Sequence, residues 1–518
     1  MGSDQTTLDS SMPAPKKRDA ASWILYDVAN TVYAAAVSFL LMPYVSELGV
    51  FEEFSYLQTI SMVLSGLSVP LMAAIADRTG RAATYLNAFT VLCVLAMAVF
   101  GAGAPMIVFM ASFMVANFAY NSALVFYNAL LPSVSTPKNE GLISGLGVGL
   151  GYLGTLLTLG LIFGLKGTIG EDPTFLILAG GFLVLAIPAM LFLHDRREIE
   201  RTRFSRALVG EQFGSLKRTL KSLKHNKNLR RFLIANFLCV DVINTAIVVF
   251  VVYTLAVFAG QQTSVLGIDF DLRIHVDPSQ WEIETPGGIG IATLLGAGLN
   301  LLALVAGVSL GVLADRWGAI RAMRTAAICL LIALSVGAVF SGEAWSVEGR
   351  DWIADQVNEY KEAKRDKADS FDIASVQGEW SAFAEREGAQ VSTVSNDEGR
   401  EFLVVEKPAS GNATAFALVL VLLGAFGLAG VWTAGRKVLL ELAPKHQVGE
   451  YFGLYGITVK ISVFGTTVFG FLMARSSPQL ALCALLALLI PGTILLFLVR
   501  SPVPASVADD DEGDIQDG

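Results

Sequence analysis

The sequence predicts an all-α multi-pass membrane protein, with twelve transmembrane helices in two six-helix halves and a small extracytoplasmic α+β insertion. Composition is the first observation behind this prediction: of 518 residues, 53% are hydrophobic and only 16% are charged, whereas soluble proteins have about 25% charged residues. The others are the recurrence of apolar runs of about 20 residues, each long enough to cross a bilayer, and a set of motifs repeated between the halves.

Twelve apolar runs are expected to span the membrane, at 22–45, 55–76, 82–102, 105–131, 141–166, 174–193, 231–259, 289–314, 320–341, 413–443, 449–474 and 478–499. The domain organisation follows from them. We expect a tail over 1–20, a six-helix bundle over 21–193, a basic linker over 194–230, a second bundle over 231–499 with insertions at 260–288 and 342–412, and an acidic, disordered tail over 500–518.

Lysine and arginine gather in the first tail, in the loop after the second span and in the linker, and these three regions fall on one side of the membrane. That side is predicted to be cytoplasmic, with both termini inside. The first twenty residues contain no apolar core, so we expect no cleaved signal peptide. The expected location is a bacterial inner membrane, and the expected state is a monomer.

The two insertions are predicted to lie outside. Residues 260–288 read as a polar loop. Within 342–412, apolar positions around Trp352 and Tyr360 indicate a surface helix, and the runs 391–394 and 402–405 on either side of a turn indicate a hairpin. The segment is either a solvated cap or a binding module.

Several kinds of chemistry have no signal in this sequence. The four cysteines lie within apolar segments without metal-ligand spacing, as expected of small buried hydrophobic residues. Neither a phosphate loop, a zinc motif nor a nucleophile–base set is present, so no enzyme activity, metal or cofactor is expected. The net charge of −9 is distributed unevenly between the two sides of the membrane, so it does not indicate a nucleic-acid partner.

Three pairs of motifs recur in the same order in the two halves, which indicates a parallel six-plus-six duplication. The first is Asp-Val-x-Asn-Thr, at 27–31 and 241–245. The second is Ala-Asp-Arg-x-Gly, at 76–80 and 314–318. The third is a glycine followed four residues later by Gly-Leu, at 141–146 and 449–454.

The second pair resembles the cytoplasmic loop motif of the major facilitator superfamily, Gly-x-x-x-Asp-Arg-x-Gly-Arg. The matching residues are Gly311, Asp315, Arg316 and Gly318 in the second half and Asp77, Arg78, Gly80 and Arg81 in the first, where Ala73 replaces the leading glycine. The resemblance implies that this loop closes the cytoplasmic gate in the outward-facing state.

A narrower resemblance is to the vacuolar-effluxer-like branch, named for an autophagy-related amino-acid effluxer of the fungal vacuole and including bacterial members. It rests on Trp23-x-x-Tyr26-Asp27-x-Ala29-Asn30, on 125–132, on the glycines of 145–154, and on 452–455 with Lys460. It covers nearly all spans and neither insertion. The resemblance implies transport, with amino acids as cargo.

Asp27 and Asp241 are the first candidates for the mechanism, because a carboxylate in a membrane helix costs roughly 2.5–3.5 kcal/mol and is usually functional. Each lies about ten residues past the basic edge, about 15 Å deep at 1.5 Å per residue. Asn30 and Asn244 follow one turn later. Each pair can bind an ammonium group or hold a proton, or it can be a structural clamp. Lys460 lies at a similar depth, where an ammonium group needs a partner. It either pairs with Asp27 or Asp241, binds a carboxylate of the cargo, or faces the lipid.

Other polar groups are open to two readings each. Asn117, Asn121 and Asn128 share one helical stripe and either line a cavity or bond between helices. Arg436, with Lys437 and Glu441, is either a gate ion pair or ordinary interfacial charge.

The sequence therefore predicts a secondary transporter that alternates access to a midplane site, for a small solute such as an amino acid, moved outward with proton coupling. Two alternatives stay open. One is a non-transporting receptor or assembly factor that uses 342–412, and the other is the same fold with a sugar or drug as cargo.

Overall fold

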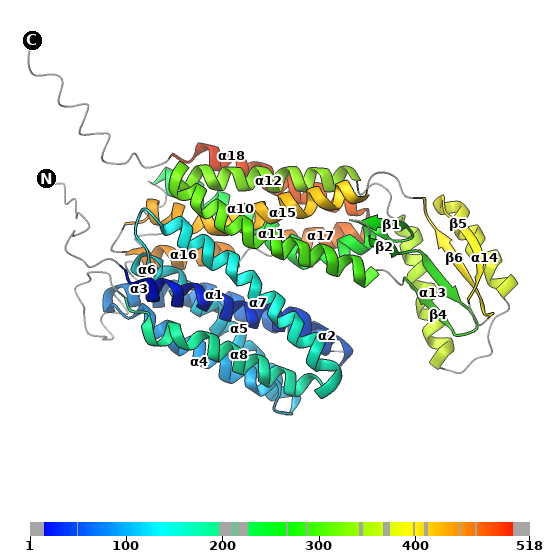
Figure 1. The fold of residues 1–518 in the computed structure, drawn as a ribbon, viewed down its shortest axis with the longest axis horizontal. Helices are drawn as coiled ribbons and strands as arrows, with labels where there is room; N and C mark the ends of the chain where they lie inside the picture. Colours follow the sequence, from blue (N-terminus) through cyan, green and yellow to red (C-terminus); the bar gives the residue numbers. More distant parts are fainter. Residues whose placement is uncertain are drawn as a thin grey trace, which may run out of the picture.

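Two bundles of membrane-length helices lie side by side in the computed structural model (Figure 1). The structure describes residues 15–195 without 49, residues 211 and 214, and residues 226–500 without 266–267, 286–287, 341–344, 366–372, 397–398, 409–412, 445–446 and 461–463. Most of the predicted basic linker, the first fourteen residues and the acidic tail therefore lie outside the described residues.

The first half contains six long helices and three short helical pieces. They are α1 (Lys17–Ala36), which continues through the π-helical η1 (Val37–Leu41) into α2 (Met42–Glu47), then α3 (Phe51–Thr79), α4 (Ala82–Phe100), α5 (Met106–Ala129), α6 (Leu131–Val134), α7 (Glu140–Ile169) and α8 (Glu171–Phe192). Their apolar side chains belong to one large core that continues into the second half and includes stacked aromatic rings.

The second half repeats the pattern with the insertions between its helices. Its membrane helices are α10 (Lys227–Phe258), α11 (Gly288–Trp317), α12 (Ala319–Phe340), α15 (Ala413–Leu442), α16 (Val448–Lys460), α17 (Phe464–Arg475) and α18 (Pro478–Leu498). Among the described residues, 11 helices are long and apolar enough to cross a membrane. The eleventh predicted span, 449–474, contains α16 and α17, and residues 461–463 between them lie outside the described residues.

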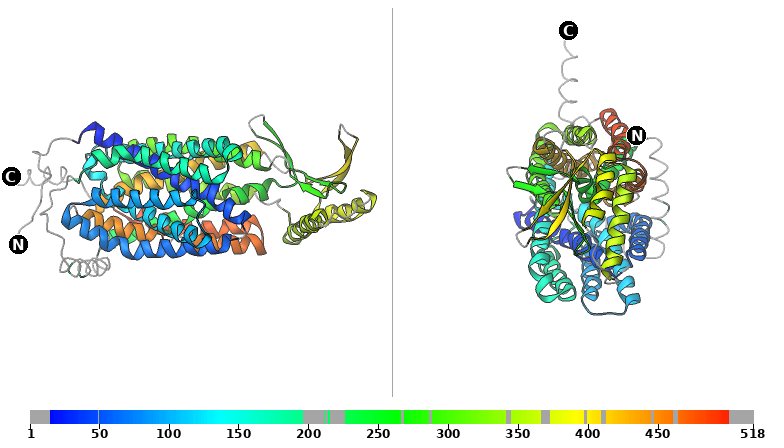
Figure 2. Two further views of the ribbon diagram at one scale, coloured as in Figure 1. Left: turned by 90° about the horizontal axis from the view of Figure 1, so that it is seen from below. Right: turned by 90° about the vertical axis from the view of Figure 1, so that its right-hand side faces the viewer.

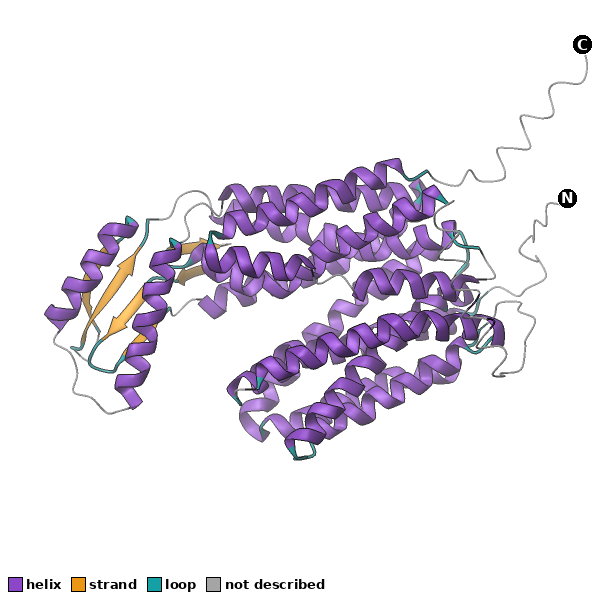
Figure 3. Ribbon diagram, turned by 180° about the vertical axis from the view of Figure 1, so that it is seen from behind, coloured by secondary structure: helices purple, strands orange, loops and turns teal. Residues whose placement is uncertain are grey.

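The halves converge at one end, which we call the motif end because α3 and α11 finish there (Figures 1 and 3). Helix α7 contacts α11 and α15, and α16 contacts α3 and α5. Toward the opposite end, which we call the insertion end, the ribbons of the two halves diverge. The contacts that join the halves thus involve the fifth span of each half.

A small α+β subdomain projects from the insertion end of the second half (Figure 2). Its sheet has the order β4-β3-β6-β5, with all neighbours antiparallel. The members are β3 (Ile274–Asp277), β4 (Glu282–Glu284), β5 (Gln390–Ser395) and β6 (Glu401–Glu406), with helices α13 (Val347–Arg365) and α14 (Ile373–Glu387). The hairpin and the surface helix are where the sequence predicted them.

The prediction of a polar loop at 260–288 was wrong. This segment forms β3 and β4 and a separate hairpin of β1 (Gln262–Val265) and β2 (Ile268–Asp271), and β3 pairs with β6 of the second insertion. Strands of three or four residues are too short to show a period. The two insertions therefore fold together into one unit, which we call the insertion subdomain (the described residues of 260–285 and 345–408).

The insertion subdomain has a core of its own. Trp380 is fully buried there with Phe383, Val276 and Leu403. Between β2 and β3 the Arg273 guanidinium donates to Asp271 over two bonds of 2.8 Å and lowers the pKa of that carboxyl to about 2. The Asp271 carboxylate is therefore ionised at any physiological pH.

Replacing Trp380 by alanine should destabilise the insertion subdomain by about 3–5 kcal/mol, because it removes a fully buried indole. Limited proteolysis in detergent should then cleave within 342–412 while the helical bundle stays intact. Glu379→Ala, one residue away and exposed, is the matched control and should resist cleavage like the wild type. Equal resistance of Trp380→Ala would contradict an independent core.

Candidate functional site

A carboxylate at the end of α3 binds the start of α16 in the other half. Asp77 Oδ1 and Oδ2 accept hydrogen bonds from the backbone N–H groups of Gly449, at 3.0 Å, and Glu450, at 2.8 Å. The first N–H groups of a helix have no partner within the helix and carry partial positive charge. The buried Asp77 carboxylate thus satisfies a helix that belongs to the opposite bundle.

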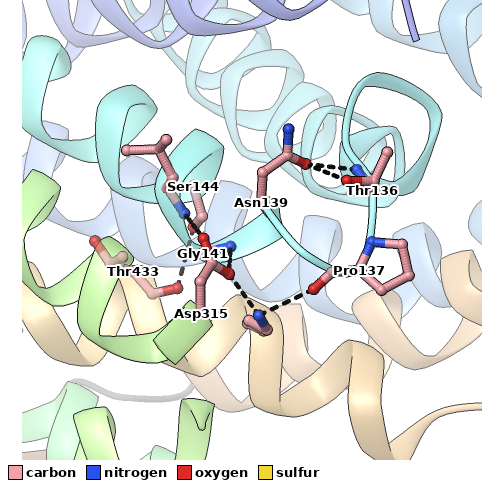
Figure 4. Close-up of polar contacts among 9 residues, drawn as sticks. Thr136, Pro137, Asn139, Gly141, Ser144, Asp315 and Thr433 are labelled. Carbon is pink, nitrogen blue, oxygen red and sulfur yellow. Dashed lines mark hydrogen bonds and ion pairs between the residues drawn. The ribbon is translucent and has the colours of Figure 1, made fainter. Parts of the chain in front are cut away.

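The second half makes the same contact in the opposite direction (Figure 4). Asp315, at the end of α11, accepts from the N–H groups of Gly141 at 2.8 Å and Leu142 at 2.7 Å, at the start of α7. Lys437 Nζ lies 2.5 Å from Asp315 Oδ1 and 3.3 Å from the Pro137 carbonyl oxygen. Each repeated motif therefore caps the fifth span of the other half.

Glycines allow the two halves to touch through their backbones at these caps. A Cβ on Gly141 or Gly145 of α7 would overlap the carbonyl oxygens of Gly311 and Gly307 on α11, and one on Gly149 would lie 2.7 Å from that of Leu304. Small residues every four positions are typical of close helix pairs in membranes. We call this line of contact between α7 and α11 the seam, and along it the two backbones meet at glycines.

The other residues of the two loops shape the turns. Gly80 ends α3 in a left-handed conformation, with φ of 63°, and its N–H donates to the Ala76 carbonyl oxygen at 2.9 Å. Gly318 likewise has φ of 96°. Such angles favour glycine. Arg78, Arg81 and Arg316 are exposed at this end.

Asp27 pairs with Arg436 across the two halves, deeper in the bundle. Arg436 Nη1 lies 3.5 Å from Asp27 Oδ2, and both side chains are less than a tenth exposed. Trp23 and Tyr127 stack at 4.2 Å, and the Arg436 guanidinium carbon lies 5.7 and 5.4 Å from their ring centroids. The pair is thus enclosed by aromatic rings, which favour a cation.

Asp241 contacts a different group. Its Oδ2 accepts from the Gly465 N–H at 2.8 Å, at the start of α17, and Thr245 and Thr466 bond at 3.1 Å beside it. The two copies of the Asp-Val-x-Asn-Thr motif therefore occupy different surroundings: one in an ion pair between halves, the other at a helix start within its own half.

The remaining candidates are placed as follows. Asn117 donates to Ser61 of α3 at 2.6 Å and Asn121 donates to the Asn117 carbonyl at 2.8 Å, so this part of the stripe bonds between and along helices. Buried Oδ1 atoms of Asn30 and Asn128 have no partner among the described residues. Asn244 is half-buried. The Lys460 side chain lies outside the described atoms, and the partner that Asp27 has is Arg436.

Gly307 was not assigned to the gate from the sequence, and Lys437 was named beside Arg436 either as part of a gate ion pair or as ordinary interfacial charge. The signals were present: Gly307 and Gly311 share the four-residue glycine spacing of α7, and two adjacent cations in an apolar span require anionic partners. Arg436, predicted as a gate residue, lies with Asp27, whereas its neighbour Lys437 lies with Asp315.

Sequence comparison places the chain among transporters. The sequence profile described as Major Facilitator Superfamily matches residues 24–348. An uncharacterized MFS-type transporter of Bacillus subtilis (strain 168) is 27% identical over 249 residues, 44% of this chain and 58% of that protein. An uncharacterized protein of Aquifex aeolicus (strain VF5) is 25% identical over 256 residues, 49% of this chain and 62% of that one. The chain thus spans about 60% of the length of these relatives.

Solved structures share the fold over their whole length. The human organic anion transporter MFSD10 superposes with a TM-score of 0.61 at 13% identity, covering 94% of this chain and 100% of that one. A bacterial homologue of the iron transporter ferroportin in an outward-facing state gives 0.58 at 12%, covering 93% and 98%. FucP in an outward conformation gives 0.56 at 13%, covering 94% and 98%.

Asp315→Asn should weaken the closure of the motif end, because it removes the charge shared by two helix N–H groups and Lys437. With a cysteine in place of Ser144, whose hydroxyl bonds across the halves to the Thr433 carbonyl oxygen, maleimide labelling should become about tenfold faster or more. Glu53→Gln, an exposed acid on α3, should leave the labelling rate unchanged. An unchanged rate with Asp315→Asn would show that the cap does not hold the halves.

Gly145→Leu should prevent the halves from closing, since the new side chain would occupy the position of the Gly307 carbonyl oxygen. We expect a loss of about 1–3 kcal/mol in stability, measured as a lower Tm, and faster labelling at Ser144→Cys. The matched control is Gly160→Leu on the same helix, which has open space around it. Similar Tm values for both variants would contradict the close packing.

Proposed function

Because the chain belongs to the Major Facilitator Superfamily, we propose that it is a secondary active transporter that moves a small solute by alternating access between its two halves. The family and its solved neighbours point to membrane transport and not to an enzyme. The motif end corresponds to the cytoplasmic side in this proposal, and the insertion end is outside.

The proposal rests on the two contacts that we call the crossed caps, in which a carboxylate of each half binds a helix start of the other. Asp77 and Asp315 each hold a helix start of the opposite half through two hydrogen bonds, over a seam of glycines. Such polar contacts can form and break as the halves move, because water can replace each partner when they separate. The closed motif end corresponds to an outward-facing state, the state in which two structural neighbours were described.

The Asp27–Arg436 pair is the proposed centre of coupling. It joins α1 to α15, so rocking of the halves must alter it, and a buried pair that loses one charge is strongly destabilised. Protonation of Asp27, or insertion of a cargo between the two charges, would release Arg436. Either event would change the free-energy difference between the two conformations, and alternating access requires such a change.

An amino acid is the proposed cargo, with proton-coupled export as the proposed direction. A zwitterion offers an ammonium group for Asp27 and a carboxylate for Arg436, whose buried Nε has no partner among the described residues. The resemblance to the amino-acid effluxer branch supports the same class. Structural neighbours carry organic anions or xylose by their descriptions, so the fold alone does not select a cargo.

Asp27→Asn should reduce gradient-driven flux at least tenfold, equivalent to about 1.4 kcal/mol of lost coupling. The measurement is uptake of a labelled amino-acid mixture into proteoliposomes, with and without an imposed proton gradient. Asp172→Asn, an acid near the insertion end, is the control and should transport like the wild type.

Two results would count against this assignment. Wild-type flux in Asp27→Asn would reduce Asp27 to a structural clamp. No flux in any variant, from protein with a wild-type Tm, would exclude amino acids as cargo and favour the alternative, a receptor that uses the insertion subdomain; its separate hydrophobic core is the observation behind that alternative.

A further inference from the structure

Helix α17 is a short segment that is held at both ends by groups outside its own helix. At its start, Gly465 donates to the buried Asp241 carboxylate of α10. Just after its end, the Ser476 carbonyl oxygen accepts a 2.6 Å hydrogen bond from Arg350 Nη2. Arg350 belongs to α13, so the outer end of a membrane helix is held by the insertion subdomain.

The start of α13 fixes Arg350 in place. Ser346 caps this helix by accepting from the Gly349 N–H at 2.9 Å, and Glu387 of α14 accepts from both the N–H and the hydroxyl of Ser346. A Cβ at Gly349 would lie 2.6 Å from the Glu387 carboxyl carbon. Arg350, in the first turn, is therefore positioned by contacts to α14 as well as by its own helix.

The same subdomain is bound to the outer end of α10. Gly260, two residues past α10, donates to the Leu272 carbonyl oxygen at 2.8 Å and accepts from the Lys407 N–H at 2.7 Å. The Trp345 ring covers Gly260 so closely that a Cβ there would overlap it, and Lys407 Nζ lies 4.9 Å from the centre of the same ring. The insertion subdomain thus contacts the ends of both α10 and α17.

These contacts form a closed loop of connections. Helices α10 and α17 meet at Asp241 and Gly465, and they are joined again, at the insertion end, through the insertion subdomain. Helix α17 packs against α10 and α18, and the bonds with Asp241 and Arg350 hold it near its two ends. Because a helix is a rigid element that can carry coupling between its ends, a shift of Arg350 is expected to act on Gly465.

We propose that Arg350 is a positioning residue through which the insertion subdomain holds α17, and with it the Asp241–Gly465 contact, in register with α10. The subdomain is then a brace on the outer part of the second half, and a change in the subdomain is transmitted to the middle of the membrane. Its effect on transport rests on the proposed function, whereas the brace itself is tested without any cargo.

The test is hydrogen–deuterium exchange of the full-length protein in detergent, comparing the wild type with Arg350→Ala. A lost charge-assisted bond should raise the exchange rate about tenfold to a hundredfold. We expect this at residues 472–476 and also at Gly465, where a merely local role of Arg350 would have no effect. Arg350→Lys, which can still donate to the carbonyl oxygen, should restore part of the protection.

Lys361→Ala provides the control, because Lys361 is an exposed cation on the same helix; its exchange should match the wild type. Protection in α14, β5 and β6 should be unchanged in Arg350→Ala, which shows that the subdomain is folded. The proposal is overturned if Gly465 exchanges at the wild-type rate, or if exchange rises equally throughout the insertion subdomain. Neither result depends on whether the cargo has been identified.

Discussion

Two carboxylates that satisfy helix starts in the opposite half govern this structure. The N–H groups at the start of α7 and α16 need acceptors away from water, and Asp315 and Asp77 provide them from across the seam. Because each bundle supplies what the other lacks, the closed motif end is a property of the pair. The glycines at 141, 145 and 449 follow from the same constraint, since the carboxylates and backbones can reach one another only where side chains are absent.

The duplicated halves use one inherited pattern for two purposes. Asp27 faces Arg436 of the other half, with aromatic rings around the pair, so its contact changes when the halves move. Asp241 faces the start of α17 within its own half and can keep its contact throughout. This asymmetry is the basis for proposing a role in coupling for Asp27 and a role in positioning for Asp241.

Most of the fold was predictable because hydropathy, basic loops and repeated motifs all depend on local sequence. The membrane helices lie where apolar runs were found, and the hairpin of β5 and β6 lies where its turn residues indicated. Long-range relations were not predicted: β3 pairs with β6, over a hundred residues away, and Asp27 pairs with Arg436, while the partner of Lys460 stays a prediction. Spacing in a sequence gives depth along a helix, but not which of several cations at that depth faces the carboxylate.

If the crossed caps hold one of two alternating conformations, removing them must change the distances between the halves. Spin labels at Arg81→Cys and Arg321→Cys report the distance between the halves at the motif end, and labels at Ile169→Cys and Val339→Cys report it at the insertion end. All four positions are exposed. The labels are placed in protein without its native cysteines, reconstituted in lipid nanodiscs. In the double variant Asp77→Asn/Asp315→Asn, the distance between the labels at the motif end should lengthen, while the distance at the insertion end should shorten. Distances that stay unchanged, or that lengthen together, would contradict alternating access governed by these caps.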